Sequence, residues 1–209
     1  MDWQTIWLFG VASFALCVSP GPDMILVAAR SAAQGRLAGF LTHLGMAAGS
    51  AIHALLLALG LSQLFLAVPY AYDFLRYLGA AYLLYLAWQA FTGRGGFSVQ
   101  SNTLCRRPLF SIFKQGLISN LLNPKVALFY LALFPQFLQP SLGCVAGQIL
   151  VLALILQVVG FVVHAFVICL ADGSRFLLMN EAAFTKWSTR FLGAVFGTLA
   201  ARLILDDPR

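Results

Sequence analysis

Charged side chains are scarce in this sequence. Only 10% of its 209 residues are Asp, Glu, Lys or Arg, whereas 61% are hydrophobic, and the mean hydropathy is +0.87. Residues 37–72 and 126–171 contain no charged residue at all. Soluble domains carry about 25% charged residues, and a helix of roughly 20 apolar residues is long enough to cross a bilayer. The composition therefore excludes a soluble globular domain and predicts an integral membrane protein.

The sequence contains only four cysteines and none of the common motifs for binding metals or nucleotides. The four cysteines are scattered in a way that gives no disulfide framework, and we interpret them as small buried hydrophobic residues: Cys17, Cys105, Cys144 and Cys169. No group of His, Cys, Asp and Glu has the spacing of metal ligands, and no glycine-rich phosphate loop carries its lysine. We therefore expect no metal, no cofactor and no direct use of ATP.

The apolar residues form six segments that are long enough to be transmembrane helices: 3–29, 39–66, 74–91, 110–137, 144–170 and 187–205. Nine of the 13 basic residues follow the first, third and fifth segments: Arg30, Arg36, Arg94, Arg106, Arg107, Lys114, Arg175, Lys186 and Arg190. By the positive-inside rule this side is cytoplasmic, which places both termini outside, in the periplasm. Topology thus explains the net charge of +6, and nucleic-acid binding is not expected. Because Met1-Asp2 offers no basic region before the first segment, no cleaved signal peptide is expected either.

Two of the six segments are interrupted by proline beside a charged residue. The first contains Ser19-Pro20-Gly21-Pro22-Asp23, and the fourth contains Asn123-Pro124-Lys125. A proline inside a helix removes a hydrogen-bond donor and kinks or ends the helix. Broken segments at corresponding places in two halves are the best sequence indication of a transporter binding site.

The two halves of the chain share landmarks in the same order. Pro22-Asp23 corresponds to Pro124-Lys125, the His53 region to the His164 region, and Arg76-Tyr77-Leu78-Gly79-Ala80 to Arg190-Phe191-Leu192-Gly193-Ala194. We predict a single membrane domain over residues 1–209, with one three-helix repeat at 1–92, a cytoplasmic linker at 93–109 and a second repeat at 110–209. Because three is odd, the second repeat is inverted. The predicted fold is all-α, with six transmembrane helices in two inverted three-helix repeats and a proline break in the first helix of each.

The breaks also contain the residues that suit ligand binding. Asn123-Pro124 is typical of a helix start, Ser19-Pro20 gives the same signal, and unpaired amides at such starts attract anions. Lys125 needs a partner inside the membrane, either Asp23 or a substrate carboxylate, whereas a carboxylate such as Asp23 also simply suits the first turn of a helix. We hypothesise a clamp for a zwitterion, in which Lys125 and the Asn123 restart hold the carboxylate and Asp23 attracts the ammonium. The substrate-binding residues predicted in this way are Ser19, Pro20, Gly21, Pro22, Asp23, Asn120, Asn123, Pro124, Lys125 and Gln136.

Proton coupling has three candidates in the membrane: Asp23, His53 and His164. Histidine titrates near neutral pH, yet a lone histidine in a transmembrane helix is more often a hydrogen-bonding partner between helices. Gln115, Asn120 and Gln136 around the second break either line a path or satisfy the broken backbone.

The motifs at the breaks resemble a known family. Ser19-Pro20-Gly21-Pro22-Asp23, the stretch from Arg30 to Gly39, Asn120 to Lys125 and Phe134-Pro135-Gln136-Phe137 are similar to the LysE/RhtB family of bacterial amino-acid exporters, and the resemblance covers nearly the whole chain. It implies a secondary transporter that exports amino acids such as threonine, homoserine or lysine across the inner membrane by exchange with protons. The partners implied are an amino acid, protons and the lipid bilayer, and a homodimer stays open.

Two other functions share features of this sequence. Thiol–disulfide electron carriers of the DsbD type also have two inverted three-helix halves, but they need a cysteine in both matching helices, and Ser119 stands where a partner for Cys17 is required. A passive channel would not depend on a proton gradient, and it gives no reason for Asp23 and Lys125 to lie at paired breaks. We therefore predict a transporter and not an enzyme.

Overall fold

The computed structural model describes residues 1–19, 21–67 and 106–171, with isolated helical positions between 77 and 88 and between 190 and 201. All regular secondary structure among these residues is helical: α1 (Trp3–Val18), α2 (Pro22–Gln34), α3 (Arg36–Ala67), α5 (Leu109–Leu121), α6 (Pro124–Leu133), two 3-10 turns η1 (Phe134–Phe137) and η2 (Pro140–Leu142), and α7 (Val145–Ala171). The all-α prediction is thus confirmed for this part of the chain. Pro20, most of the third and sixth predicted segments with Arg76, and linker residues 93–105 lie outside the described residues.

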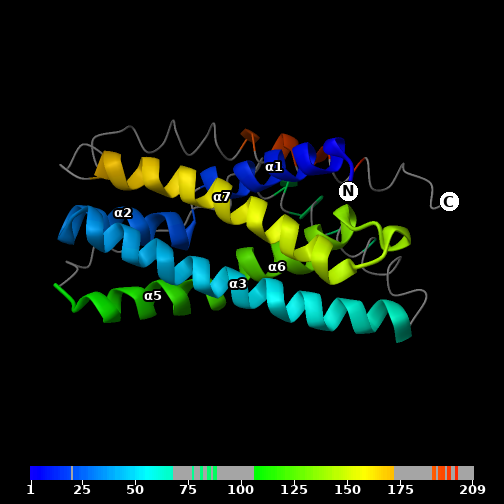
Figure 1. Ribbon diagram of the computed structural model, residues 1–209. Helices are drawn as coiled ribbons and strands as arrows, with labels where there is room; N and C mark the ends of the chain where they lie inside the picture. The colour runs from blue at the N-terminus through cyan, green and yellow to red at the C-terminus, as the bar shows by residue number, and fades with distance from the viewer. Residues whose placement is uncertain are drawn as a thin grey trace.

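The helices form one bundle of continuous and broken elements (Figure 1). Residues 36–60 of α3 and the whole of α7 are each long and apolar enough to cross a membrane. The pairs α1–α2 and α5–α6 qualify as spans when each is taken together with its bend of 57° or 50°. The described chain therefore contains two to four candidate spans, and both predicted helix breaks are present. Figure 1 shows both breaks near the middle of the bundle.

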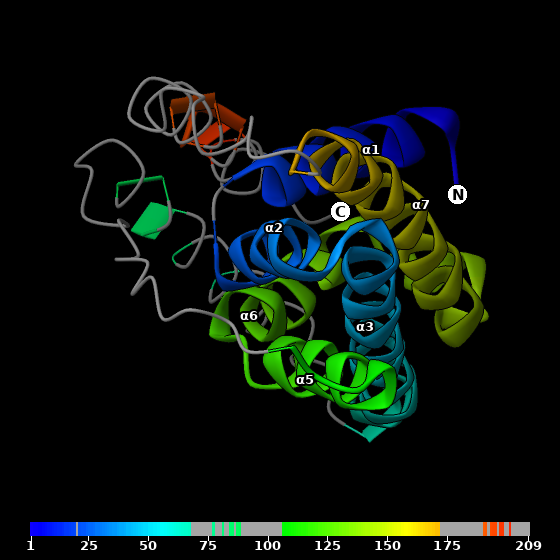
Figure 2. The ribbon, with the colours of Figure 1, turned by 90° about the vertical axis from the view of Figure 1, so that its left-hand side faces the viewer.

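Each half of the chain packs against the other. Helix α3 contacts α5 and α7, while α7 also contacts α1 and α2. The view along the helices in Figure 2 shows α2 near the centre, with α3 and α7 beside it and α5 and α6 beneath it. Phe9 of α1 packs against η1, because its ring meets those of Phe134 and Phe137 edge-on at centroid distances of 5.1 and 5.2 Å, and it lies 6.1 Å from the Phe129 ring of α6. This packing holds the two breaks against each other.

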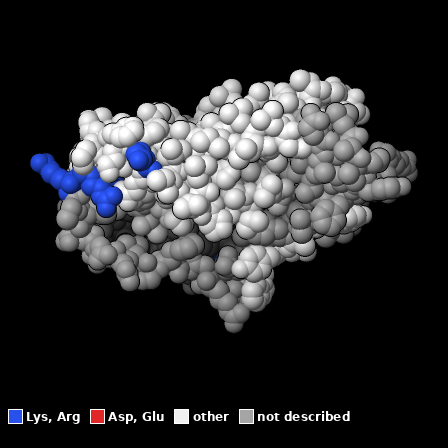
Figure 3. Space-filling view, turned by 90° about the horizontal axis from the view of Figure 1, so that it is seen from below, with Lys and Arg blue, Asp and Glu red and all other residues white. Residues whose placement is uncertain are grey.

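The end of α2 is tied to the start of α5. The Gln34 side chain accepts a hydrogen bond from the Arg107 amide and donates one to the Arg107 carbonyl, at 3.0 and 3.1 Å. Arg30, which is fully buried, donates to Gln115 Oε1 and Gln34 Oε1. Figure 3 shows the Lys and Arg side chains of one face gathered at the end where α5 begins. Of the basic residues after the first and third predicted segments, those that the structure describes thus lie at one end of the bundle.

Glycine lets α3 and α5 approach to backbone contact. A methyl group added at Gly45 of α3 would meet the carbonyl oxygen of Phe113, and one added at Gly116 of α5 would meet that of Thr42. Small residues at such crossings allow close packing of membrane helices. The spacing of Gly45 and Gly49 predicts this use, and Gly49 does lie against Asn120.

We expect Gly45→Ala to destabilise the bundle. The added methyl group meets a backbone oxygen that cannot move aside, and overpacking of this kind costs about 1–3 kcal/mol. Gly60→Ala on the same helix is the matched control, since nothing lies within 4 Å of the added methyl group there. Thermal unfolding of the two variants in detergent should show a lower midpoint for Gly45→Ala only. Equal midpoints would contradict the close crossing.

Candidate functional site

The first break lies between α1 and α2. Helix α1 ends at Val18, and the amide of Ser19 still bonds to Ala15 O at 3.1 Å. Helix α2 begins at Pro22, with Gly21 in extended conformation as its N-cap. The predicted helix start at Ser19-Pro20 is therefore wrong: Ser19 closes α1, because the residue before a proline is disfavoured in helical conformation and Pro22 sets the start. Gly21 has no side chain to cap the first amides of α2.

The second break lies between α5 and α6 and has the predicted cap. The Asn123 side chain accepts a hydrogen bond from the Lys125 amide at 3.0 Å, and Pro124 occupies the first position of α6. The Val126 and Ala127 amides both bond to Asn123 O. Because these bonds use the first donors of α6, the expectation of unpaired amides at this restart is wrong. Of the two helices that begin at the breaks, α6 has a side-chain cap and α2 has none.

The charged residue that follows the proline of each break forms hydrogen bonds with residues of the other break. Lys125 Nζ donates to the carbonyl oxygens of Leu16 and Ser19 at the end of α1, at 3.1 and 3.0 Å. Asp23 accepts from Asn120 Nδ2 at 2.8 Å and from Ser119 Oγ at 3.2 Å, both at the end of α5. Of the two partners considered for Lys125, Asp23 therefore does not form an ion pair with it in the described structure, and a substrate carboxylate stays a prediction. The reason is that a cation is stabilised by the free carbonyls at a helix C-terminus and a carboxylate by a helix N-terminus.

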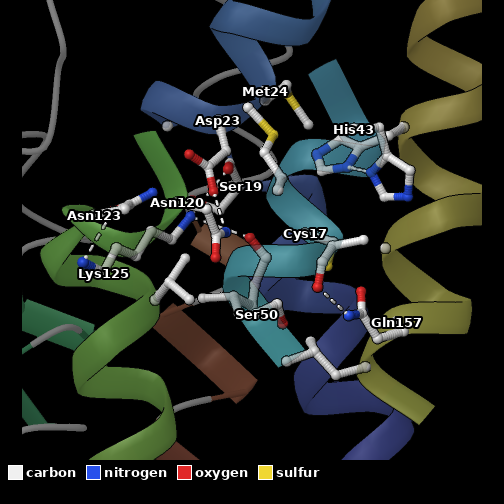
Figure 4. A pocket seen from close by; sticks show the side chains of 18 residues that line it. Cys17, Ser19, Asp23, Met24, His43, Ser50, Asn120, Asn123, Lys125 and Gln157 are labelled. Atoms are coloured by element: carbon white, nitrogen blue, oxygen red, sulfur yellow. Dashed lines mark hydrogen bonds between the residues drawn. The ribbon is translucent and has the colours of Figure 1, made fainter. Parts of the chain in front are cut away.

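A cavity of about 80 Å³ lies between the two breaks (Figure 4). A water needs roughly 10–15 Å³ of such volume, so the space admits a few waters or part of a small solute. Five helices form its walls: α1, α2, α3, α6 and α7, with Asn120 from the last turn of α5. Its polar lining consists of Ser19, Asp23, His43, Ser50, Asn120, Asn123, Lys125, Gln157 and His164, and its apolar lining includes Leu16, Met24, Met46, Val126 and Leu156.

One acceptor in this lining is unused. Asn120 is 5% exposed, and its Oδ1 has no hydrogen-bond partner among the described residues, although its Nδ2 donates to Asp23. A buried polar atom without a partner is costly, by about 1–3 kcal/mol. Asn120 Oδ1 therefore offers a bonding position to a donor that enters the cavity.

The histidines separate into a pair and a single residue. His43 Nδ1 of α3 and His164 Nδ1 of α7 lie 2.9 Å apart, and both rings are buried at the cavity wall. His53 stacks on Tyr130 at a centroid distance of 5.6 Å and is not part of the cavity lining. The sequence reasoning overlooked His43. The only signal was that it is one of three histidines in stretches without charged residues, which does not show which of them pair.

The predicted substrate-binding residues do not all reach the cavity. Ser19, Gly21, Asp23, Asn120, Asn123 and Lys125 line it. Gln136 of η1 instead donates to Ala132 O in the last turn of α6 at 2.7 Å, and Gln115 accepts from Arg30. Pro22 and Pro124 shape the breaks without lining the space, and Pro20 lies outside the described residues. Residues that the sequence reasoning missed, Ser50 and Gln157, come from the middle of α3 and α7.

The arrangement provides charges of both signs around a small space. No group of three or more His, Cys, Asp and Glu that could hold a metal is found among the described residues. Asp23 and Lys125 are partly buried in the first turns of α2 and α6, and neutral hydrogen-bonding groups and apolar side chains line the same cavity. This chemistry suits a small molecule that carries one positive and one negative group.

Comparison with known proteins gives a consistent result. A family model described as LysE type translocator matches residues 14–207. The chain is 30% identical over 201 residues to a leucine efflux protein of Salmonella typhimurium, covering 94% of this chain and 93% of the relative. It is 32% identical over 204 residues to an uncharacterized membrane protein of Pseudomonas aeruginosa, with the same shares covered. A leucine efflux protein of an Enterobacter species is 28% identical over 201 residues. No solved structure matches.

Proposed function

This chain belongs to the LysE type translocator family, and from that premise we propose that it exports amino acids with aliphatic side chains in exchange for protons. It is a multi-pass membrane protein and a transporter rather than an enzyme. The observation that carries the proposal is that Asp23 and Lys125, each just after a helix break, line one cavity.

The carboxylate of the substrate binds between Lys125 and the start of α2. Lys125 Nζ lies near Gly21, 3.6 Å from where a Cβ of that residue would be. The first turn of α2 has no side-chain cap, so its amides and its dipole favour an anion. An ammonium and a helix N-terminus thus converge on one position. This corrects the hypothesis that the Asn123 restart supplies the amides.

The ammonium of the substrate binds beside Asp23. The carboxylate of Asp23 supplies the charge, and the unused Asn120 Oδ1 supplies an acceptor. Charge-assisted hydrogen bonds to a carboxylate are roughly twice as strong as neutral ones. A free amino acid can make both sets of contacts, whereas an amine or a carboxylic acid can make only one.

The side chain of the substrate faces apolar residues. Leu16, Met24, Met46, Val126 and Leu156 line the cavity, and methionine adapts to different shapes. Two of the three relatives described above, from Salmonella typhimurium and an Enterobacter species, are leucine efflux proteins. Threonine and homoserine are alternatives of similar size, whereas lysine is disfavoured because Asp23 is the one acidic residue of this lining.

Transport follows from movement of the two halves around this site. The proposed arrangement is six helices in two inverted repeats, in the inner membrane, with both termini in the periplasm. Because Asp23 and Lys125 each bond to the helix of the opposite break, rocking of one half against the other changes both sets of contacts. The oligomeric state, including a homodimer, does not enter this mechanism.

Efflux from proteoliposomes tests the proposal. Labelled leucine, threonine, homoserine, lysine and the amine and acid analogues of leucine are loaded, and release is followed with and without an imposed proton gradient. We expect faster release of leucine with the gradient and little release of either analogue. Release that ignores the gradient would indicate a passive channel, and release of the analogues at the rate of leucine would contradict the zwitterion site.

Gly21→Ser should weaken substrate binding without harming the fold. Serine is a favoured N-cap, so its hydroxyl would take the amide of α2 that is proposed for the substrate carboxylate. Gly21 has an extended backbone that any residue adopts, so Gly21→Ala is the matched control. We expect the KM for efflux to rise about tenfold or more in the serine variant relative to the alanine variant. An equal KM in both would exclude the α2 amides from the site.

A further inference from the structure

The hydrogen bond between His43 and His164 restricts the protonation states that the two rings can adopt. Their Nδ1 atoms are 2.9 Å apart, so one must donate and the other accept. The donating ring then has a bare Nε2, which can take a second proton while the shared hydrogen bond stays intact. The pair therefore changes its charge by one without any change of its geometry.

The pair lies where such a charge affects the substrate site. Both histidines line the cavity that contains Asp23, Asn120 and Lys125. His43 belongs to the first half of the chain and His164 to the second, so the hydrogen bond also joins α3 to α7. His43 is 8% exposed and His164 9%, and the ring of Phe161 lies over His43 at a centroid distance of 5.7 Å. In this shielded position a charge interacts with its neighbours more strongly than in water.

The described helices around the pair carry other ionisable groups, of which His53 of α3 stacks on Tyr130 outside the cavity lining. Cys17, Asp23 and Lys125 line the same cavity. Tyr130 bonds to Ser50, and Arg30 bonds to Gln115 and Gln34. Lys114 is exposed on α5, and Arg36 begins α3. Asp23 is thus the acid and Lys125 the base that share the cavity with the imidazoles.

We propose that His43 and His164 together form the proton-binding site that drives exchange, by binding one proton in competition with the ammonium group of the substrate. The inference rests on the proposed function and adds the coupling residues to it. A protonated pair places a second positive charge beside Lys125 in a small cavity, and this repels the ammonium of an amino acid. When the substrate leaves, the proton is bound; when the proton leaves, the substrate is bound again. Because the cavity holds either the proton or the substrate, movement of one across the membrane is coupled to movement of the other in the opposite direction.

The test uses the double variant His43→Asn with His164→Asn in proteoliposomes. Two asparagine amides can keep a hydrogen bond between α3 and α7, but neither takes up a proton near neutral pH. Two fluxes of labelled leucine are measured: exchange against unlabelled leucine at equal pH on both sides, and net efflux driven by a proton gradient. We expect leucine exchange to remain measurable and the stimulation by the gradient to be lost completely.

The outcomes separate this inference from the proposed function. Absence of leucine exchange by the wild-type protein would contradict the proposed function. Gradient-stimulated efflux by the double variant would overturn the histidine pair as coupling site, and so would loss of the stimulation in His53→Gln alone. A measurement on the wild-type protein covers the case of a variant that does not fold. In detergent, the ring nitrogens of two of the three ¹⁵N-labelled histidines should titrate as one coupled step, and independent titration of all three would also overturn the inference.

Discussion

Replacing Lys125 by methionine is expected to abolish export, with a loss of about 100-fold or more in the efflux rate, equivalent to about 2.7 kcal/mol of transition-state stabilisation. The ammonium bonds to Leu16 O and Ser19 O at the end of α1, and it is the proposed partner of the substrate carboxylate. Methionine preserves most of the side-chain length but donates no hydrogen bond. The two carbonyl oxygens then lose their partner, at about 1–3 kcal/mol for each one that stays shielded from water.

Two matched variants separate the role of the charge from its geometry. Lys114→Met removes a lysine from the exposed face of α5, where its Nζ lies 6.0 Å from the Phe110 ring centroid, and should export normally. Lys125→Arg keeps the charge and the donors, so it should keep the fold and part of the efflux. Labelled leucine release from proteoliposomes of equal protein content gives the rates. Wild-type efflux by Lys125→Met would remove Lys125 from the site.

The break positions were predictable because proline acts locally. A proline removes its own donor and restricts the residue before it, whatever the tertiary structure. Pro22 and Pro124 therefore fixed the starts of α2 and α6, and Asn123 is the cap that its residue type favours. The contact of Gly45 with α5 follows equally from a local pattern of small residues.

The partners across the site were not predictable, because they depend on which helix ends meet. Sequence alone showed opposite charges at two breaks, and it left open whether Lys125 pairs with Asp23 or with a substrate carboxylate. In the structure each charge lies at the end of the opposite broken helix, so Lys125 bonds to backbone carbonyls and Asp23 to side chains of α5. The pairing of His43 with His164 over 121 positions depends in the same way on the crossing of α3 and α7. A single histidine in an apolar helix gives no such information.

Asp23→Asn is expected to reduce export about 100-fold while leaving the fold intact. The variant side chain has the same shape, and a turn of the Asn120 amide would let its Oδ1 accept from the new amide group. Hydrogen bonding between α2 and α5 is therefore kept, whereas the negative charge beside the proposed ammonium site is lost. Asp2→Asn is the matched control, because Asp2 is exposed and caps α1 by accepting from the Thr5 amide, which asparagine also does. Efflux of labelled leucine and the unfolding midpoint are measured for both.

Exchanging the two charges shows whether Asp23 acts with Lys125 as an ion pair or separately. An ion pair tolerates reversal, so Asp23→Lys combined with Lys125→Asp would restore the efflux that each single change removes. The structure predicts no rescue, because reversal places a cation at the start of α2, where the dipole of α2 opposes it, and a carboxylate against the carbonyl oxygens that end α1, which repel it. Rescue to near the wild-type rate would mean that the two charges meet during transport. If the charge-reversed double variant does not transport and Asp2→Asn transports normally, the two charges bind the two ends of the substrate at separate positions.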